Sequence, residues 1–127
     1  MALKKAQLIA AAFALAVASP ALGHEEVKGP NGGHVMESSG HHIEFVPSQT
    51  EVTFYLSDAA GKPIASKGTK AKVFVQEGGK TIPLVLTPTD PDKLTGKLAA
   101  PLSSGAKVAV TATMTDGHNL QARYVVP

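Results

Sequence analysis

Histidine is concentrated near the start of the chain. Four of the five histidines fall within 19 residues, close to a methionine and a glutamate; the set is His24, His34, Met36, His41, His42 and Glu44. A neutral imidazole offers a lone pair near physiological pH, which makes histidine the commonest metal ligand. The chain has no cysteine, so nitrogen, thioether and carboxylate ligands favour copper first, with zinc, nickel or cobalt as further candidates.

A β-hairpin would bring several of these side chains together. Residues 38–40 separate two short runs that contain apolar residues, and three loop residues that end in glycine suit a hairpin turn. In that register Met36 faces His42 and His34 faces Glu44, with Cβ atoms about 4.5 to 5.5 Å apart in each opposed pair. We therefore expect His34, His42 and Glu44 to be metal ligands, with Met36 as an addition.

A loop of residues 39–40 alone is the alternative. It would pair Met36 with Ile43 and His34 with Phe45, turning both potential ligands towards the core. We favour the three-residue loop, because a slip of one residue would expose Val35 and bury His34.

The N-terminus has the layout of a secretory signal peptide. Two lysines precede an uncharged run over residues 6–17, and the small residues Ala21 and Gly23 follow. The run is shorter than the roughly 20 apolar residues that span a bilayer. Cleavage after Gly23 would leave His24 at the mature N-terminus, where its amine and its ring can chelate copper(II) together. Cleavage after Ala21 is the alternative, and it would remove that chelate.

The mature chain is expected to be a single neutral domain. Residues 24–127 carry ten basic and ten acidic residues, so nothing in the composition predicts nucleic-acid binding. Without cysteine there is no disulfide and no lipid-bearing thiol to tether the chain. We expect a soluble periplasmic protein without a membrane anchor, with a polar lead-in over residues 24–33 and one domain over residues 34–127.

Apolar residues alternate with polar ones along most of the mature chain, with glycine and proline at the turns. The expected strands cover residues 34–37, 41–46, 52–56, 71–76, 81–86, 94–99, 108–114 and 120–124. Pro83 predicts an edge strand or a bulge, because proline donates no hydrogen bond to a ladder. The pattern predicts an all-β fold, an antiparallel immunoglobulin-like β-sandwich of seven or eight strands.

Nothing in the chain indicates an enzyme. No serine, histidine and acid occur at a recognisable spacing, and no glycine-rich phosphate loop leads into a helix. His41 has the strand parity of Ile43 and Phe45, which favours a histidine at the rim of the core over a ligand. His118 lies in a turn, and it would add a ligand only if that turn lies at the same end of the sandwich.

One stretch resembles a known family. The run Gly29-Pro30-Asn31-Gly32-Gly33, followed by the hairpin and His42-Ile43-Glu44-Phe45, is similar to a pattern in small exported proteins associated with heavy-metal resistance. It also resembles the N-terminal segment of membrane-fusion subunits of heavy-metal efflux systems. Gly32, Gly33, His42 and Glu44 match, whereas the position of Asn31 is often histidine in those relatives. The resemblance implies periplasmic metal handling, with an efflux complex as a partner.

Two functions follow as hypotheses. The first is a copper-preferring chaperone or buffer that binds an ion reversibly and hands it to an efflux partner. The second is a non-catalytic β-sandwich interaction module that docks on an exported or efflux assembly. Metal binding should raise thermal stability and be lost when the histidines are protonated below about pH 6, whereas a docking module should respond to neither.

Overall fold

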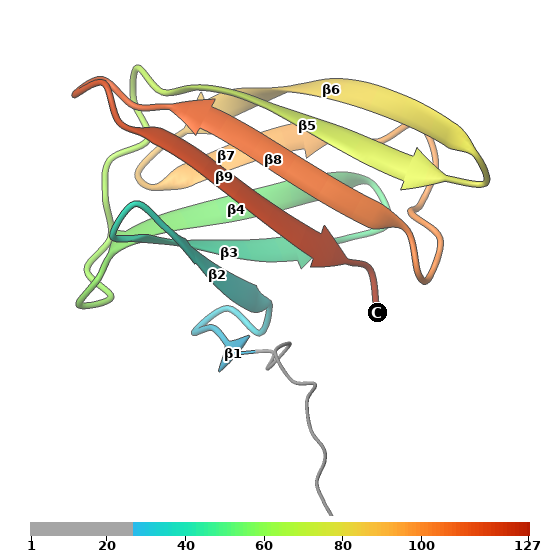
Figure 1. Ribbon diagram of the computed structural model, residues 1–127, viewed down its shortest axis with the longest axis horizontal. Coiled ribbons are helices and arrows are strands. Elements are labelled where there is room, and N and C mark those ends of the chain that lie inside the picture. Colours follow the sequence, from blue (N-terminus) through green and yellow to red (C-terminus); the bar gives the residue numbers. More distant parts are fainter. Residues whose placement is uncertain (1–26) are drawn as a thin grey trace, which may run out of the picture.

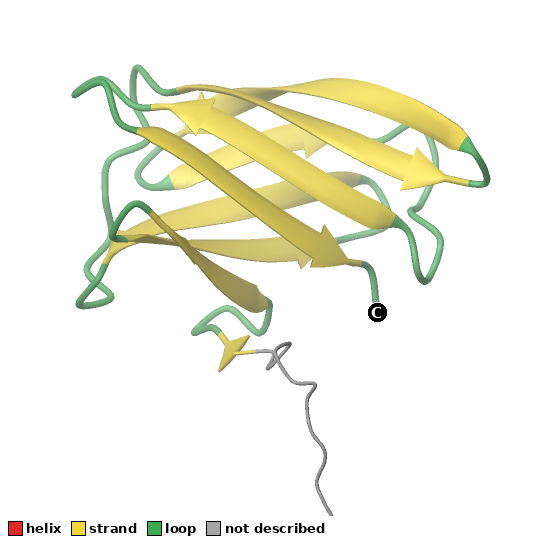
Figure 2. Ribbon diagram, viewed as in Figure 1, coloured by secondary structure: helices red, strands yellow, loops and turns green. Residues whose placement is uncertain are grey.

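The computed structural model describes residues 27–127, and these residues form nine β-strands and no helix (Figures 1 and 2). The strands are β1 (Val27–Lys28), β2 (His34–Ser38), β3 (His41–Pro47), β4 (Glu51–Asp58), β5 (Lys70–Glu77), β6 (Lys80–Thr89), β7 (Lys93–Lys97), β8 (Lys107–Thr113) and β9 (Asn119–Val125). The expected all-β class is confirmed. The expected signal peptide and the expected chelate at His24 lie outside the described residues.

All nine strands belong to one antiparallel sheet with the order β1-β2-β3-β4-β7-β6-β5-β8-β9. The sheet curls into a half-barrel, so that the layer of β5, β8 and β9 lies over β3, β4 and β7 (Figure 1). Strand β6 connects the two layers, because its first part pairs with β5 and only Thr87 to Thr89 pair with β7. The strand count is nine where seven or eight were expected, and the immunoglobulin-like arrangement stays a prediction.

Strand alternation places the core between the two layers. Val52, Phe54 and Leu56 on β4 are buried, and so are the inward residues of β5, β8 and β9. The rings of Phe45, Phe54 and Tyr124 pack together, with centroids 5.0 to 5.9 Å apart. A period of two in the sequence thus becomes one apolar face on each strand.

The β2–β3 register is the one that we expected less. Its turn has only two residues, Ser39 and Gly40, with φ of 49° and 77°. Positive φ at both positions is the geometry of a type I′ turn, whose twist matches that of a β-hairpin. Met36 therefore pairs with Ile43, and His34 pairs with Phe45. The three-residue loop was the wrong prediction.

Burial does not determine the register of β2, because this strand lies near an edge of the sheet, where an inward side chain can stay exposed. Met36 is on the inner side and is still 41% exposed. His34 and Val35 are both partly buried, so this strand has no strong preference for one register over the other.

Pro83 lies in the part of β6 that pairs with β5 alone, opposite Phe74. This position agrees with the expectation for a proline in a strand. Among the residues that the structure describes, no helix has the length and apolarity needed to cross a membrane.

Candidate metal site

The residues expected to be ligands are divided between the two faces of the hairpin. His34 shares the inner face with its partner Phe45, whereas His42 and Glu44 have the opposite parity. Within residues 27–127, no group of three or more histidine, cysteine, aspartate or glutamate side chains could hold one ion. The tertiary structure therefore does not assemble His34, His42 and Glu44 into a single site.

Glu44 has structural partners. It is buried, and its carboxylate accepts three hydrogen bonds from the loop before β2. The donors are the backbone N–H of Asn31 at 2.9 Å, the Asn31 side-chain amide at 3.0 Å and the backbone N–H of Gly33 at 2.7 Å. A buried carboxylate needs such donors, because burial without them removes its hydration without compensation. Glu44 ties the loop to β3.

The glycines of this loop pack closely against β3. A Cβ added to Gly29 would overlap the Glu44 carboxylate, and a Cβ added to Gly33 would overlap the backbone carbonyl oxygen of Phe45. The backbone N–H of Gly29 also donates to the carbonyl of Gly33, which closes the loop on itself. Much of the glycine and His-x-Glu pattern in the sequence is therefore explained by packing of the loop on Glu44.

Tyr124, on β9, contacts β3 from the core side. Its hydroxyl donates a hydrogen bond of 2.7 Å to the backbone carbonyl of Ile43. Burial, and then the negative charge of Glu44, raise the pKa of Tyr124 well above its ordinary value. The tyrosine is therefore neutral in the folded protein over the physiological range.

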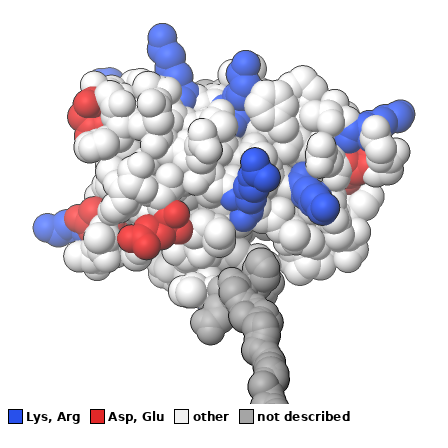
Figure 3. Space-filling view, viewed as in Figure 1, with Lys and Arg blue, Asp and Glu red and all other residues white. Residues whose placement is uncertain are grey.

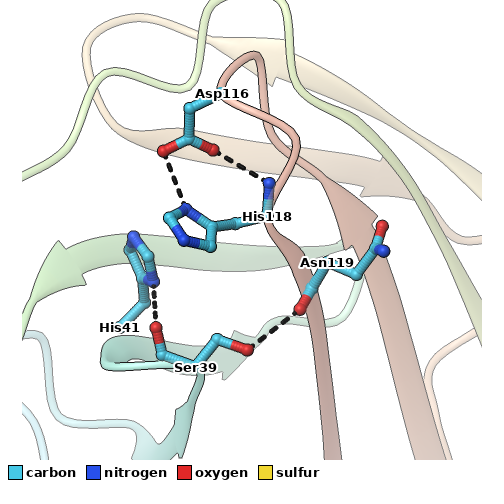
Figure 4. Close-up of polar contacts among 5 residues, drawn as sticks. All are labelled: Ser39, His41, Asp116, His118 and Asn119. Atoms are coloured by element: carbon cyan, nitrogen blue, oxygen red, sulfur yellow. Dashed lines mark hydrogen bonds and ion pairs between the residues drawn. The ribbon is translucent and has the colours of Figure 1, made fainter.

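Two other histidines do meet in space. The rings of His41, at the start of β3, and His118, in the β8–β9 turn, have centroids 5.4 Å apart and planes inclined at 58°. The side chain of His118 is 56% exposed, and His41 is partly buried. They are 77 positions apart in the sequence, so only the tertiary fold brings them together (Figure 4).

Hydrogen bonds between the two hairpins hold this pair in place. The Ser39 hydroxyl donates to the backbone carbonyl of Asn119 at 3.2 Å, and the Ser38 hydroxyl accepts from the backbone N–H of Gln121 at 2.9 Å. Strand β2 and its turn therefore lie against β9, which places His41 beside the turn that carries His118.

Each imidazole is also oriented by its own partner. Nδ1 of His41 lies 2.9 Å from the backbone carbonyl oxygen of Ser39, and Nδ1 of His118 lies 2.8 Å from Oδ2 of Asp116. Figure 4 shows these two bonds directed to opposite sides, away from the facing rings. A carbonyl and a carboxylate can only accept, so Nδ1 is the donor in both rings. In a neutral imidazole the remaining nitrogen, Nε2, then carries the free lone pair.

The electrostatics favour the ionised form of Asp116. The backbone N–H of His118, and then its side chain, hold the pKa of this carboxyl below its ordinary value. An ionised carboxylate on the far side of an imidazole fixes the tautomer and raises the basicity of the other ring nitrogen, an arrangement common behind metal-ligating histidines.

Part of this pair was anticipated from the sequence. We expected His41 to be a rim residue, and we expected His118 to contribute only if its turn lay at the same end as the hairpin. That condition is met, because the two rings are adjacent. The expected register missed that Ser38 belongs to β2, opposite His41, where its hydroxyl bonds to β9.

Comparison of the chain with protein-family models, with curated proteins and with solved structures finds no match.

Proposed function

We propose that this protein binds a transition-metal ion reversibly through Nε2 of His41 and Nε2 of His118. Copper is the first candidate, and the biological role is that of an exported metal chaperone or buffer. The observation that carries the proposal is the pair of facing imidazoles, each held at Nδ1 by an acceptor.

The separation of the rings suits a shared ion. Two imidazoles that bind one ion through Nε2 at about 2.0–2.1 Å have ring centroids about 5 to 6.5 Å apart, for angles at the metal between tetrahedral and linear. The observed centroid distance of 5.4 Å lies in that interval.

A site that leaves coordination positions of the ion open favours exchange of the ion over permanent storage. Structural metal sites are usually closed by four protein ligands, whereas sites that exchange or react keep open positions. Two imidazoles leave the remaining positions to water or to a ligand from a partner. This arrangement fits a protein that accepts an ion and hands it on, and the heavy-metal efflux systems suggested by the sequence resemblance are the proposed recipients.

The donor atoms rank the metals. Imidazole suits copper, zinc and nickel, and divalent copper binds a given nitrogen site most tightly in the Irving–Williams order. Copper(I) can also bind two nitrogen donors, but a linear arrangement would require the ring centroids to move from 5.4 Å to about 6.5 Å apart. The ranking is therefore copper, then zinc and nickel.

Calorimetric titration of the purified chain with copper(II), zinc and nickel, and with copper(I) under reductant, tests the proposal. His41→Gln and His118→Gln should each lower the affinity at least tenfold. His42→Gln is the matched control from the adjacent position and should bind like the parent. Asp116→Asn should weaken binding about 10- to 100-fold, because the amide has no charge and only one acceptor oxygen for the two N–H donors of His118.

Three results would each change the conclusion. Loss of binding in His42→Gln alone would move the site to the outer face of the hairpin. Full binding by the His41 and His118 variants would overturn the pair as the site. Failure of the parent to bind any of these ions would overturn metal binding altogether and favour the docking module.

A further inference from the structure

The outer face of β5, β8 and β9 carries basic side chains and no acidic one. Strand register places every second residue of these strands outward, because the residues between them, such as Val73 and Val110, are buried. The outward basic residues are Lys70, Lys72, Lys107 and Arg123, and all four are exposed. The other outward positions on these three strands are neutral. We call this surface the basic face.

Figure 3 shows basic side chains over the middle of this layer, with the acidic side chains in view lying towards its margins. The clustering is not a consequence of composition, since residues 24–127 have as many acidic as basic residues. The fold separates the charges by directing these four cations to one side of one layer.

Apolar side chains project among the cations. Phe74, Val85 and Val125 are 36%, 76% and 54% exposed on the same outward side. The ammonium group of Lys72 lies 6.0 Å from the centre of the Phe74 ring. An open hollow of about 690 Å³ lies beside them, and its lining includes Lys70, Lys72 and Val85.

From this combination we infer that the basic face docks on an anionic lipid bilayer surface. Basic side chains without competing carboxylates are attracted to phosphate headgroups, and exposed apolar side chains can enter the interfacial layer between them. A protein partner fits less well, because lysine is depleted in protein–protein interfaces and three of these four cations are lysines.

The docking is independent of the proposed metal site. None of the four cations of the basic face contributes to the His41–His118 pair or to the hydrogen bonds at its two Nδ1 atoms. A negative result for metal binding would therefore not contradict lipid docking, and a negative result for lipid docking would not contradict metal binding.

Co-sedimentation with vesicles tests the inference. The metal-free chain is mixed with vesicles of phosphatidylcholine alone, or of phosphatidylcholine with phosphatidylglycerol. We expect binding to the anionic vesicles only. Each neutralising change, such as Lys72→Gln, should lower the partition coefficient about fivefold, and the pair Lys72→Glu with Arg123→Glu should abolish binding. Val85→Ser should lower it more modestly by removing an apolar contact.

The matched control is the pair Lys62→Glu with Lys97→Glu, which changes the net charge equally on exposed residues outside the basic face. This pair should keep at least half of the parent affinity. An equal loss of vesicle affinity in both double variants would show that only the net charge matters. That result would overturn the basic face as the docking site. Absence of binding to anionic vesicles would overturn lipid docking, as would binding of a DNA oligonucleotide instead of vesicles, or self-association through this face in light scattering.

Discussion

Replacing Glu44 tests the structural role of this carboxylate as the anchor of the loop before β2. Glu44→Ala removes the acceptor of three hydrogen bonds and leaves the buried N–H of Gly33 without a partner. An orphaned buried donor costs about 1–3 kcal/mol. The N–H of Asn31 is only partly buried, so water can replace some of its bond. We expect a loss of about 3 kcal/mol in the free energy of unfolding.

Glu44→Gln should be much milder. The Gln carbonyl oxygen can accept both backbone N–H groups at the position of Oε2, while its amide faces the side chain of Asn31. Rotation of the Asn31 amide by half a turn then presents its oxygen to the new donor. Only the charge is lost, and neutral hydrogen bonds are about half as strong as charged ones. We expect a cost of about 1 kcal/mol.

Urea unfolding followed by circular dichroism measures both changes, with the slope compared to confirm that only stability has altered. Glu37→Gln, on an exposed carboxylate of β2, is the matched control and should stay within about 0.5 kcal/mol of the parent. An Ala variant as stable as this control would refute the role of Glu44 as the anchor of the loop. A Gln variant as unstable as the Ala variant would refute the bond-by-bond reasoning and assign the effect to the charge.

Two further predictions concern the same region. Tyr124→Phe removes the hydrogen bond to Ile43 and should lower stability by about 1 kcal/mol at neutral pH. Because the folded-state pKa of Tyr124 is raised, its stabilising contribution is present below the unfolded value of about 10 and is lost as the pH rises above it. The difference between parent and variant should therefore shrink above pH 10 in thermal melts, and a difference that stays constant to pH 12 would contradict the assignment. Gly33→Ala should lower the urea midpoint by an amount worth about 1–3 kcal/mol, because the added Cβ meets the carbonyl of Phe45, and an unchanged midpoint would show that the loop moves freely.

The fold class was predictable because it depends on local alternation. Val52, Phe54 and Leu56 are two positions apart in the sequence, and each is at most 1% exposed. The strands expected over residues 71–76 and 108–114 were readable for the same reason. The joining of both layers into one sheet through β6 was not, since it depends on which strands pair across long stretches of chain.

Only the residue types of the candidate site were predictable from the sequence, and their arrangement was not. The enrichment in histidine was visible, but the preferred register put His34 beside Glu44, whereas the structure separates them. A change of one residue in the length of the loop shifts the register of the hairpin. The burial preference that usually selects one register is weak on a strand near the edge of a sheet. Glu44 illustrates a second difficulty, because a carboxylate in a ligand-like spacing proved to accept hydrogen bonds from the loop before β2.

By itself, the sequence determined the β-structure, the apolar face of each strand and the concentration of histidine near the N-terminus, because all three are properties of neighbouring residues. The tertiary structure alone decided that His41 meets His118, that Glu44 anchors a glycine loop and that four cations share one outer face. These features join residues from separate strands. Their geometry is set by the packing of the whole sheet around Phe45, Phe54 and Tyr124, and no local pattern encodes it.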